Sequence, residues 1–141
     1  STTDDELLTL VDGRGQSAGA ALQRAAAVHP WTAKPPKRPV VWVRQDFAGI
    51  EAGEIYAPGL AELGLSPDRL IVVRARDVPS VLRAGEEAAR CPPLGAVLIE
   101  PWGAPKALDL VASRRLALAA ARSNVPLFMV LRALNRSQVR R

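Results

Sequence analysis

Five short apolar runs, spaced far enough apart for helices to lie between them, constrain the fold of this chain more than any other feature. They are rich in valine, isoleucine and leucine, and they cover residues 7–11, 39–43, 70–73, 95–99 and 126–131. None alternates polar with apolar residues, and such continuous runs are typical of strands that helices cover on both faces of a parallel sheet. The runs therefore predict an α/β fold.

The segments between the runs carry helix signals. We predict helices over residues 17–28, 56–63, 78–90 and 108–123. Gly64 is placed to end the second helix, Asp77 to cap the third, and Asn124 to end the last. The last helix is expected to pack through Leu110, Val111, Leu116, Leu118 and Ala119. Strands alternating with helices predict right-handed crossovers and a three-layer α-β-α sandwich with a mostly parallel sheet.

The bulk properties favour one globular domain over residues 1–141. Hydrophobic residues make up 48% and charged residues 23%, which excludes a disordered chain. No apolar stretch approaches the roughly 20 residues of a membrane span, and the start lacks the layout of a signal peptide. We therefore expect a cytoplasmic address. With one cysteine, Cys91, and one histidine, His29, neither a disulfide framework nor a zinc site is expected, and Cys91 should be at least half buried.

The connection after the first run is glycine-rich and has the strand, loop and helix context of a phosphate-binding loop. Its residues of interest are Gly13, Arg14, Gly15, Gln16, Ser17 and Gly19. Setting Gly19 at the second glycine of the nucleotide-binding motif puts Ala20 and Ala21 where lysine and a magnesium-holding hydroxyl are needed. This predicts a protein that is not an enzyme and needs no cofactor or metal. Two alternatives stay open for the loop: a turn that merely leads into the helix, and residual phosphate binding.

Two further strand-end residues are candidates. Glu100 lies at the end of the fourth run, at a Walker-B-like position on the strand that we expect beside the first; alternatively it is a hydrogen-bonding or salt-bridge residue. Trp102 follows it in a loop and is a candidate exposed anchor for a partner, whereas Trp42 lies within an apolar run and is expected in the core.

Arginine dominates the basic residues, with 16 arginines against 3 lysines and a net charge of +5. One group lies on the last predicted helix, another lies near the C-terminus, and a smaller group surrounds Lys34 and Lys37. The candidate partner or DNA contacts among them are Arg114, Arg115, Arg122, Arg132 and Arg136. If they face one way they would bind phosphates with salt-dependent affinity; otherwise they form a solvated basic surface.

Seven passages stand out when they are taken in order along the chain: VVWVR (40–44), IYAPGL (55–60), LGLSPDRLI (63–71), VRARD (73–77), EEA (86–88), EPWG (100–103) and LVASRRLALAA (110–120). Together they resemble the ImuA family, RecA-like accessory proteins of bacterial SOS mutagenesis. Several matching segments in order are more specific than any one of them.

The resemblance implies a RecA-like core, related to P-loop NTPases, with a degenerate nucleotide loop. It also implies work with ImuB and an error-prone polymerase in translesion synthesis. The expected partners are ImuB, the polymerase and/or RecA, and self-association stays open. The chain is shorter than expected for the family, so we expect it to lack N- and C-terminal segments. The leading hypothesis is a non-catalytic adaptor. The alternatives are DNA binding through the arginine clusters and, less favoured, an atypical nucleotide hydrolase.

Overall fold

The computed structural model describes residues 8–29, 38–46, 48, 53, 64–103 and 109–133. The strands are β1 (Leu8–Asp12), β2 (Val40–Gln45), β3 (Leu70–Ala75), β4 (Ala96–Glu100) and β5 (Leu127–Leu131). The helices are α1 (Ala18–Val28), α4 (Val78–Ala89) and α5 (Leu110–Ser123), and a 3-10 turn, η2 (Pro67–Arg69), precedes β3. The predicted strands and three predicted helices are confirmed; the helix predicted over 56–63 lies outside the described residues.

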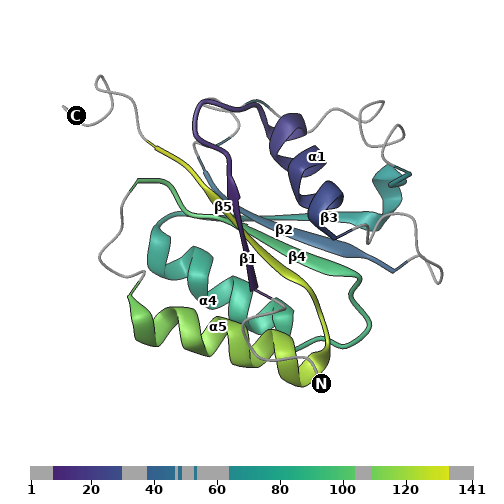
Figure 1. Cartoon of the computed structure of the whole chain (residues 1–141), viewed down its shortest axis with the longest axis vertical. Helices are drawn as coiled ribbons and strands as arrows, with labels where there is room; N and C mark the ends of the chain where they lie inside the picture. The colour runs from purple at the N-terminus through teal and green to yellow at the C-terminus, as the bar shows by residue number, and fades with distance from the viewer. Residues whose placement is uncertain are drawn as a thin grey trace.

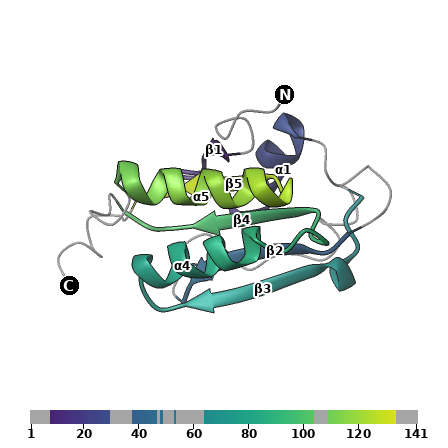
Figure 2. The same ribbon diagram turned by 90° about the horizontal axis from the view of Figure 1, so that it is seen from below.

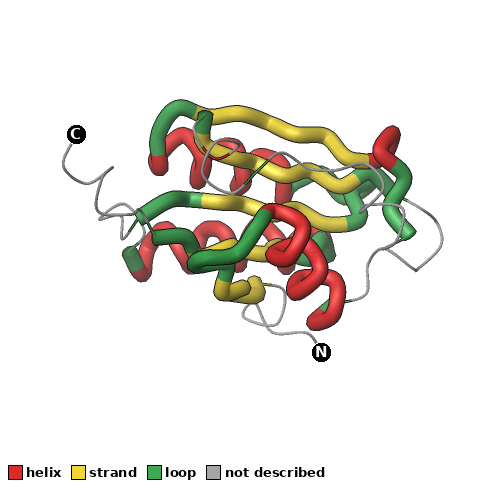
Figure 3. Tube along the Cα trace, turned by 90° about the horizontal axis from the view of Figure 1, so that it is seen from above, coloured by secondary structure: helices red, strands yellow, loops and turns green. Residues whose placement is uncertain are grey.

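The strands form one sheet in the order β1-β5-β4-β2-β3, and all its pairs are parallel. Helix α1 covers one face, and α4 and α5 lie side by side on the other (Figure 1, Figure 2). Figure 3 shows the strands between the helices of the two outer layers. The predicted three-layer α-β-α sandwich is therefore confirmed.

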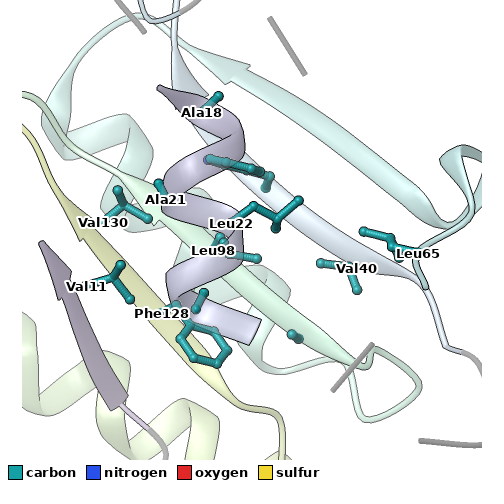
Figure 4. Close-up of a cluster of buried hydrophobic side chains, with 12 residues drawn as sticks. Val11, Ala18, Ala21, Leu22, Val40, Leu65, Leu98, Phe128 and Val130 are labelled. Atoms are coloured by element: carbon teal, nitrogen blue, oxygen red, sulfur yellow. The ribbon is translucent and has the colours of Figure 1, made fainter. Parts of the chain in front are cut away.

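Every second residue of the central strands faces α1. On that face the strands contribute Val40, Trp42, Ala96, Leu98, Phe128 and Val130, and α1 contributes Ala18, Ala21, Leu22 and Ala25 (Figure 4). The small alanines let the helix approach the sheet closely. Burial of each large side chain contributes about 1.5–3 kcal/mol to stability.

The alternate residues of the same strands face α4 and α5. A Cβ at Gly85 of α4 would lie only 2.4 Å from Cγ2 of Ile99, so glycine is what allows this helix to sit so near β4. The predicted apolar face of α5 is partly wrong, because Val111 is 65% and Leu118 37% exposed. The stripe that faces the core instead follows the 3.6-residue period through Leu116 and Ala120.

Polar caps fix the helix ends. Ser17, Asp77 and Asp109 each accept a hydrogen bond from the backbone N–H three residues later, at 3.1, 2.9 and 2.8 Å. Such a cap contributes about 1 kcal/mol. Asn124 ends α5 in the left-handed conformation (φ 56°, ψ 41°), as its sequence position predicted.

The two edge strands depart from the expectation of full coverage. Leu10 of β1 is 62% exposed, and Ile71 and Val72 of β3 are 47% and 42% exposed. Their apolar sequences resemble those of the central strands, but each edge strand pairs on one side only within the sheet. Cys91 is also exposed, which corrects the prediction that it is at least half buried.

Candidate functional site

Three charged side chains are buried together where the central strands end. Arg44 lies near the end of β2, Glu100 is the last residue of β4, and Arg132 directly follows β5; they are 3%, 0% and 3% exposed. Each continues the alternate-residue row that faces α1, two positions beyond the last apolar residue of that row. Ligand sites of open α/β sheets lie beyond the carboxyl ends of the strands, so this cluster marks the candidate site.

Glu100 is the centre of the cluster. Its Oε1 accepts hydrogen bonds from Nε of Arg44 at 2.6 Å and from the Trp42 indole at 3.2 Å. Its Oε2 accepts from Nε of Arg132 at 2.7 Å. A buried carboxylate is tolerable only with such partners. Two guanidinium groups to one carboxylate leave the cluster with one excess positive charge.

Backbone carbonyls accept the remaining hydrogen bonds of the two guanidinium groups. Arg44 donates to the carbonyls of Gly53 at 3.1 Å and Ala48 at 3.3 Å. Nη1 of Arg132 donates to the carbonyls of Gly13 and Gln16, while its Nη2 has no hydrogen-bond partner among the described residues. The network therefore ties the segments that follow β1 and β2 to the end of β4.

Two tryptophans border the cluster. Trp42 is fully buried, as predicted, and its ring centroid lies 5.3 Å from Cζ of Arg44. Trp102 is only 8% exposed, its ring lies 5.2 Å from Cζ of Arg132, and its backbone N–H donates to Oε1 of Gln45 at 2.6 Å. The interpretation of Trp102 as an exposed partner anchor is wrong, because its ring packs against a buried guanidinium.

The glycines of the β1–α1 loop have different roles. A Cβ at Gly13 would lie 2.6 Å from Cγ1 of Val130 and 3.1 Å from the Leu131 carbonyl oxygen. Gly15 has a φ of 71°, in the left-handed region that favours glycine. At Gly19 an added Cβ would meet nothing within 4 Å. The first two are therefore required by the local backbone and packing, and Gly19 is not.

The backbone N–H groups of this loop donate hydrogen bonds within the protein. The N–H of Gly13 donates to Leu131 O at 2.9 Å, that of Arg14 to Asp12 Oδ1 at 3.1 Å, and that of Gln16 to Gly13 O at 3.0 Å. A phosphate-binding loop instead directs its N–H groups toward the ligand. Here inward carbonyls surround the guanidinium of Arg132, which favours the structural turn over a phosphate cradle.

The two alanines at the nucleotide-motif positions differ in their burial. Ala21 is fully buried and belongs to the core under α1, while Ala20 is half buried. The position that would hold a magnesium ligand therefore faces the hydrophobic core.

The prediction that Glu100 lies on the strand beside the first strand is wrong. Among the described strands, β4 pairs with β5 and β2 while β1 pairs with β5 alone, so Glu100 does not lie on the strand beside the first. β5 separates the two because β1 occupies the sheet edge. The alternative interpretation of Glu100 as a hydrogen-bonding and ion-pairing residue is confirmed.

The predicted arginine contacts separate into two kinds. The prediction that Arg132 is a surface contact is wrong, because its side chain is buried against Glu100. Arg114, Arg115 and Arg122 are exposed on α5, and Arg115 pairs with Glu86 at 3.1 Å. Arg136 lies outside the described residues, as do Lys34 and Lys37.

Sequence reasoning missed the role of Arg44, which we noted only as the last residue of the VVWVR passage. The signal was present: all five apolar runs are followed directly by a charged residue, and after the three central strands these residues are Arg44, Glu100 and Arg132. Parallel neighbouring strands bring such ends together at one edge of a sheet. Opposite charges at several strand ends therefore indicate a buried ion pair.

Asp12 and Arg14, at the mouth of the loop, give a testable titration. The side-chain hydrogen bond from Arg14, followed by its backbone N–H, lowers the pKa of Asp12 from 3.8 to about 2. Because the folded pKa is the lower one, the pair stabilises the fold above pH 3.8 and this contribution is lost as pH falls through about 2. Carboxyl-carbon NMR should show Asp12 titrating near pH 2. Arg14→Gln should raise the pKa of Asp12 only part of the way back toward 3.8, because the backbone N–H of residue 14 still donates to the carboxylate, and Arg24→Gln should change it little.

Within the described ranges, no group of three or more histidine, cysteine, aspartate or glutamate side chains is placed to hold a metal ion. Among those same residues, no helix has the length and apolar character to cross a membrane.

These features define a three-layer α/β domain whose strand-end site is occupied by its own side chains. SulA from Pseudomonas aeruginosa, in its crystal structure, shares the fold with a TM-score of 0.59. The match covers 91% of this chain and 98% of that one, at 16% sequence identity.

In sequence the chain is similar to Protein ImuA of Caulobacter vibrioides, at 40% identity over 80 residues. Two strains, NA1000 / CB15N and ATCC 19089 / CIP 103742 / CB 15, give the same figures and amount to one relative. The matched residues are 57% of this chain but span only 29% of that protein's length. The resemblance to the ImuA family is thereby confirmed. No protein-family model matches the chain.

Proposed function

We propose that this chain is an accessory protein of SOS-induced, error-prone DNA repair that acts as a non-catalytic adaptor in translesion synthesis. The similarity to ImuA supports the biological role. The observation that carries the non-catalytic part is the guanidinium of Arg132, which occupies the β1–α1 loop between the carbonyls of Gly13 and Gln16.

Nucleotide hydrolysis needs groups that neutralise charge on the phosphates and hold magnesium. Ala20 and Ala21 supply neither a cation nor an oxygen ligand. Both oxygens of Glu100 are already engaged by arginines, so the carboxylate is not free to orient a metal-bound water. These contacts support a protein that does not hydrolyse nucleotides.

The resemblance supplies the candidate partners. An adaptor with a RecA-like core would engage ImuB, an error-prone polymerase or a RecA filament, and it would do so without nucleotide exchange. Purified partners test this by analytical ultracentrifugation and calorimetry. Absence of a complex with all three would remove the adaptor proposal.

Nucleotide binding is tested separately. Calorimetric titration with Mg-ATP is expected to give no saturable heat, and incubation with Mg-ATP is expected to release no phosphate above a protein-free control. The physical reason is that a phosphate would have to displace a buried guanidinium from its carbonyl partners. Saturable binding together with turnover would contradict the non-catalytic assignment.

A further inference from the structure

A groove runs between α4 and α5 on the face of the sheet away from α1. It consists of two hollows of about 180 and 460 Å³ that share Glu86 and Arg115. Figure 2 shows the two helices lying side by side over the sheet. Arg115 and Arg122, two of the candidate contact residues on α5, line it.

Packing beneath the helices holds the groove in place. Gly85 brings α4 against Ile99, and Leu82 of α4 and Leu116 of α5 are buried in the core on this face. Across the groove, Arg115 donates two hydrogen bonds to the Glu86 carboxylate, at 3.1 and 3.4 Å. The two walls are thus joined to the sheet below and to each other.

The larger hollow is strongly basic. Arg90, Arg115 and Arg122 line it, against the single carboxylate of Glu86. Glu86 pairs with Arg115 at 3.1 Å and with Arg90 at 3.5 Å, and Arg90 also lies 4.0 Å from the exposed carboxylate of Glu87. Within the part of the chain that the structure describes, Arg122 makes no ion pair. Exposed guanidinium groups of this kind form bidentate hydrogen bonds with carboxylates or phosphates.

Apolar surface accompanies the charge. Leu118, 37% exposed, and Ala119 line the larger hollow, and Pro79 and Leu82 line the smaller one. A ligand that fills the groove would therefore bury carbon atoms as well as pair with arginines.

We propose that the α4–α5 groove binds an acidic segment of a partner protein, with aspartate or glutamate residues beside an aliphatic or aromatic anchor. The carboxylates meet Arg90 and Arg122, and the anchor packs on Leu118. Recognition of acidic motifs by arginine clusters is a recurring mode of peptide binding. The proposal rests on the adaptor function only in taking the partner to be a protein.

Nucleic acid fits the same surface less well. Both helices begin at the carboxyl edge of the sheet, and Asp77 and Asp109 are their N-cap residues. The two carboxylates therefore lie at the same end of the groove. Glu86 lines both hollows, and the exposed Glu87 lies 4.0 Å from Arg90. A phosphate backbone would pass these carboxylates along the way, whereas a short acidic segment fits the basic end alone.

The test is a selection from a random peptide library displayed on phage, made against wild-type protein and counter-selected with an Arg90→Glu/Arg122→Glu variant. Recovered peptides are expected to carry acidic residues next to leucine, isoleucine or an aromatic residue. As synthetic labelled peptides they should bind the double variant about a hundredfold more weakly, since each charge-assisted contact contributes on the order of tenfold. Leu118→Ser should weaken binding about tenfold through lost apolar burial.

Arg24→Glu, at an exposed arginine of α1 on the other face, is the matched control and should bind like wild type. Peptides without acidic residues, or equal binding by the charge-reversed variant, would overturn the proposal. So would labelled DNA oligonucleotides that lose binding on charge reversal while no acidic peptide is recovered. Because the selection needs neither ImuB, polymerase nor RecA, its failure is distinguishable from failure of the adaptor function.

Discussion

Replacing Glu100 by glutamine is expected to lower the free energy of unfolding by about 3–5 kcal/mol, the cost of breaking a buried ion pair from one side. The amide keeps the size of the side chain but removes the carboxylate that contacts both Arg44 and Arg132. Both guanidinium groups are 3% exposed, so water cannot replace the lost charge. Two uncompensated cations would then lie within one buried cluster.

Equilibrium urea denaturation of Glu100→Gln measures this effect. Glu87→Gln is the matched control, because its carboxylate side chain is 72% exposed and 4.0 Å from Arg90. The control should stay within about 0.5 kcal/mol of wild type, as exposed ion pairs contribute little. Equal stability of the two variants would mean that the buried cluster does not hold the strand ends together.

The fold was predictable because its signals are local. Uninterrupted apolar runs, the capping position of Asp77 and the stop at Asn124 each depend on a few neighbouring residues. Strand order is different in kind, since it depends on which runs pair across the whole chain. The sequence does not distinguish β1 from a central strand, and its edge position separates it from Glu100.

The site was only partly predictable for a similar reason. Glu100 pairs with Arg44 and Arg132, which are 56 and 32 residues away in the chain. Arginines are almost always exposed, so a composition rule assigns Arg132 to the surface. Its burial follows from the sheet, because the row facing α1 continues past Val130 and places the next side chain beside Glu100. Trp102 was misplaced for the same reason, since its environment is created by Arg132 and Gln45.

The β1–α1 loop is organised around the guanidinium of Arg132. A loop that served phosphates would need the freedom of its second glycine, Gly19, where the helix begins. A loop organised around Arg132 instead needs Gly13, whose carbonyl accepts from that guanidinium and whose missing side chain makes room for Val130. The packing therefore predicts that the fold tolerates alanine far less well at Gly13 than at Gly19.

Gly13→Ala is expected to destabilise the fold by about 1–3 kcal/mol, because overpacking forces neighbouring atoms to move. One of those neighbours, the Leu131 carbonyl oxygen at 3.1 Å, is backbone and has little freedom to shift. Gly19→Ala, in the first turn of α1 with open space around its Cβ, should stabilise the fold by about 0.5–1 kcal/mol. Thermal and urea unfolding of both variants supply the comparison. A destabilised Gly19→Ala beside a neutral Gly13→Ala would contradict the role of Gly13 in packing the loop around Arg132.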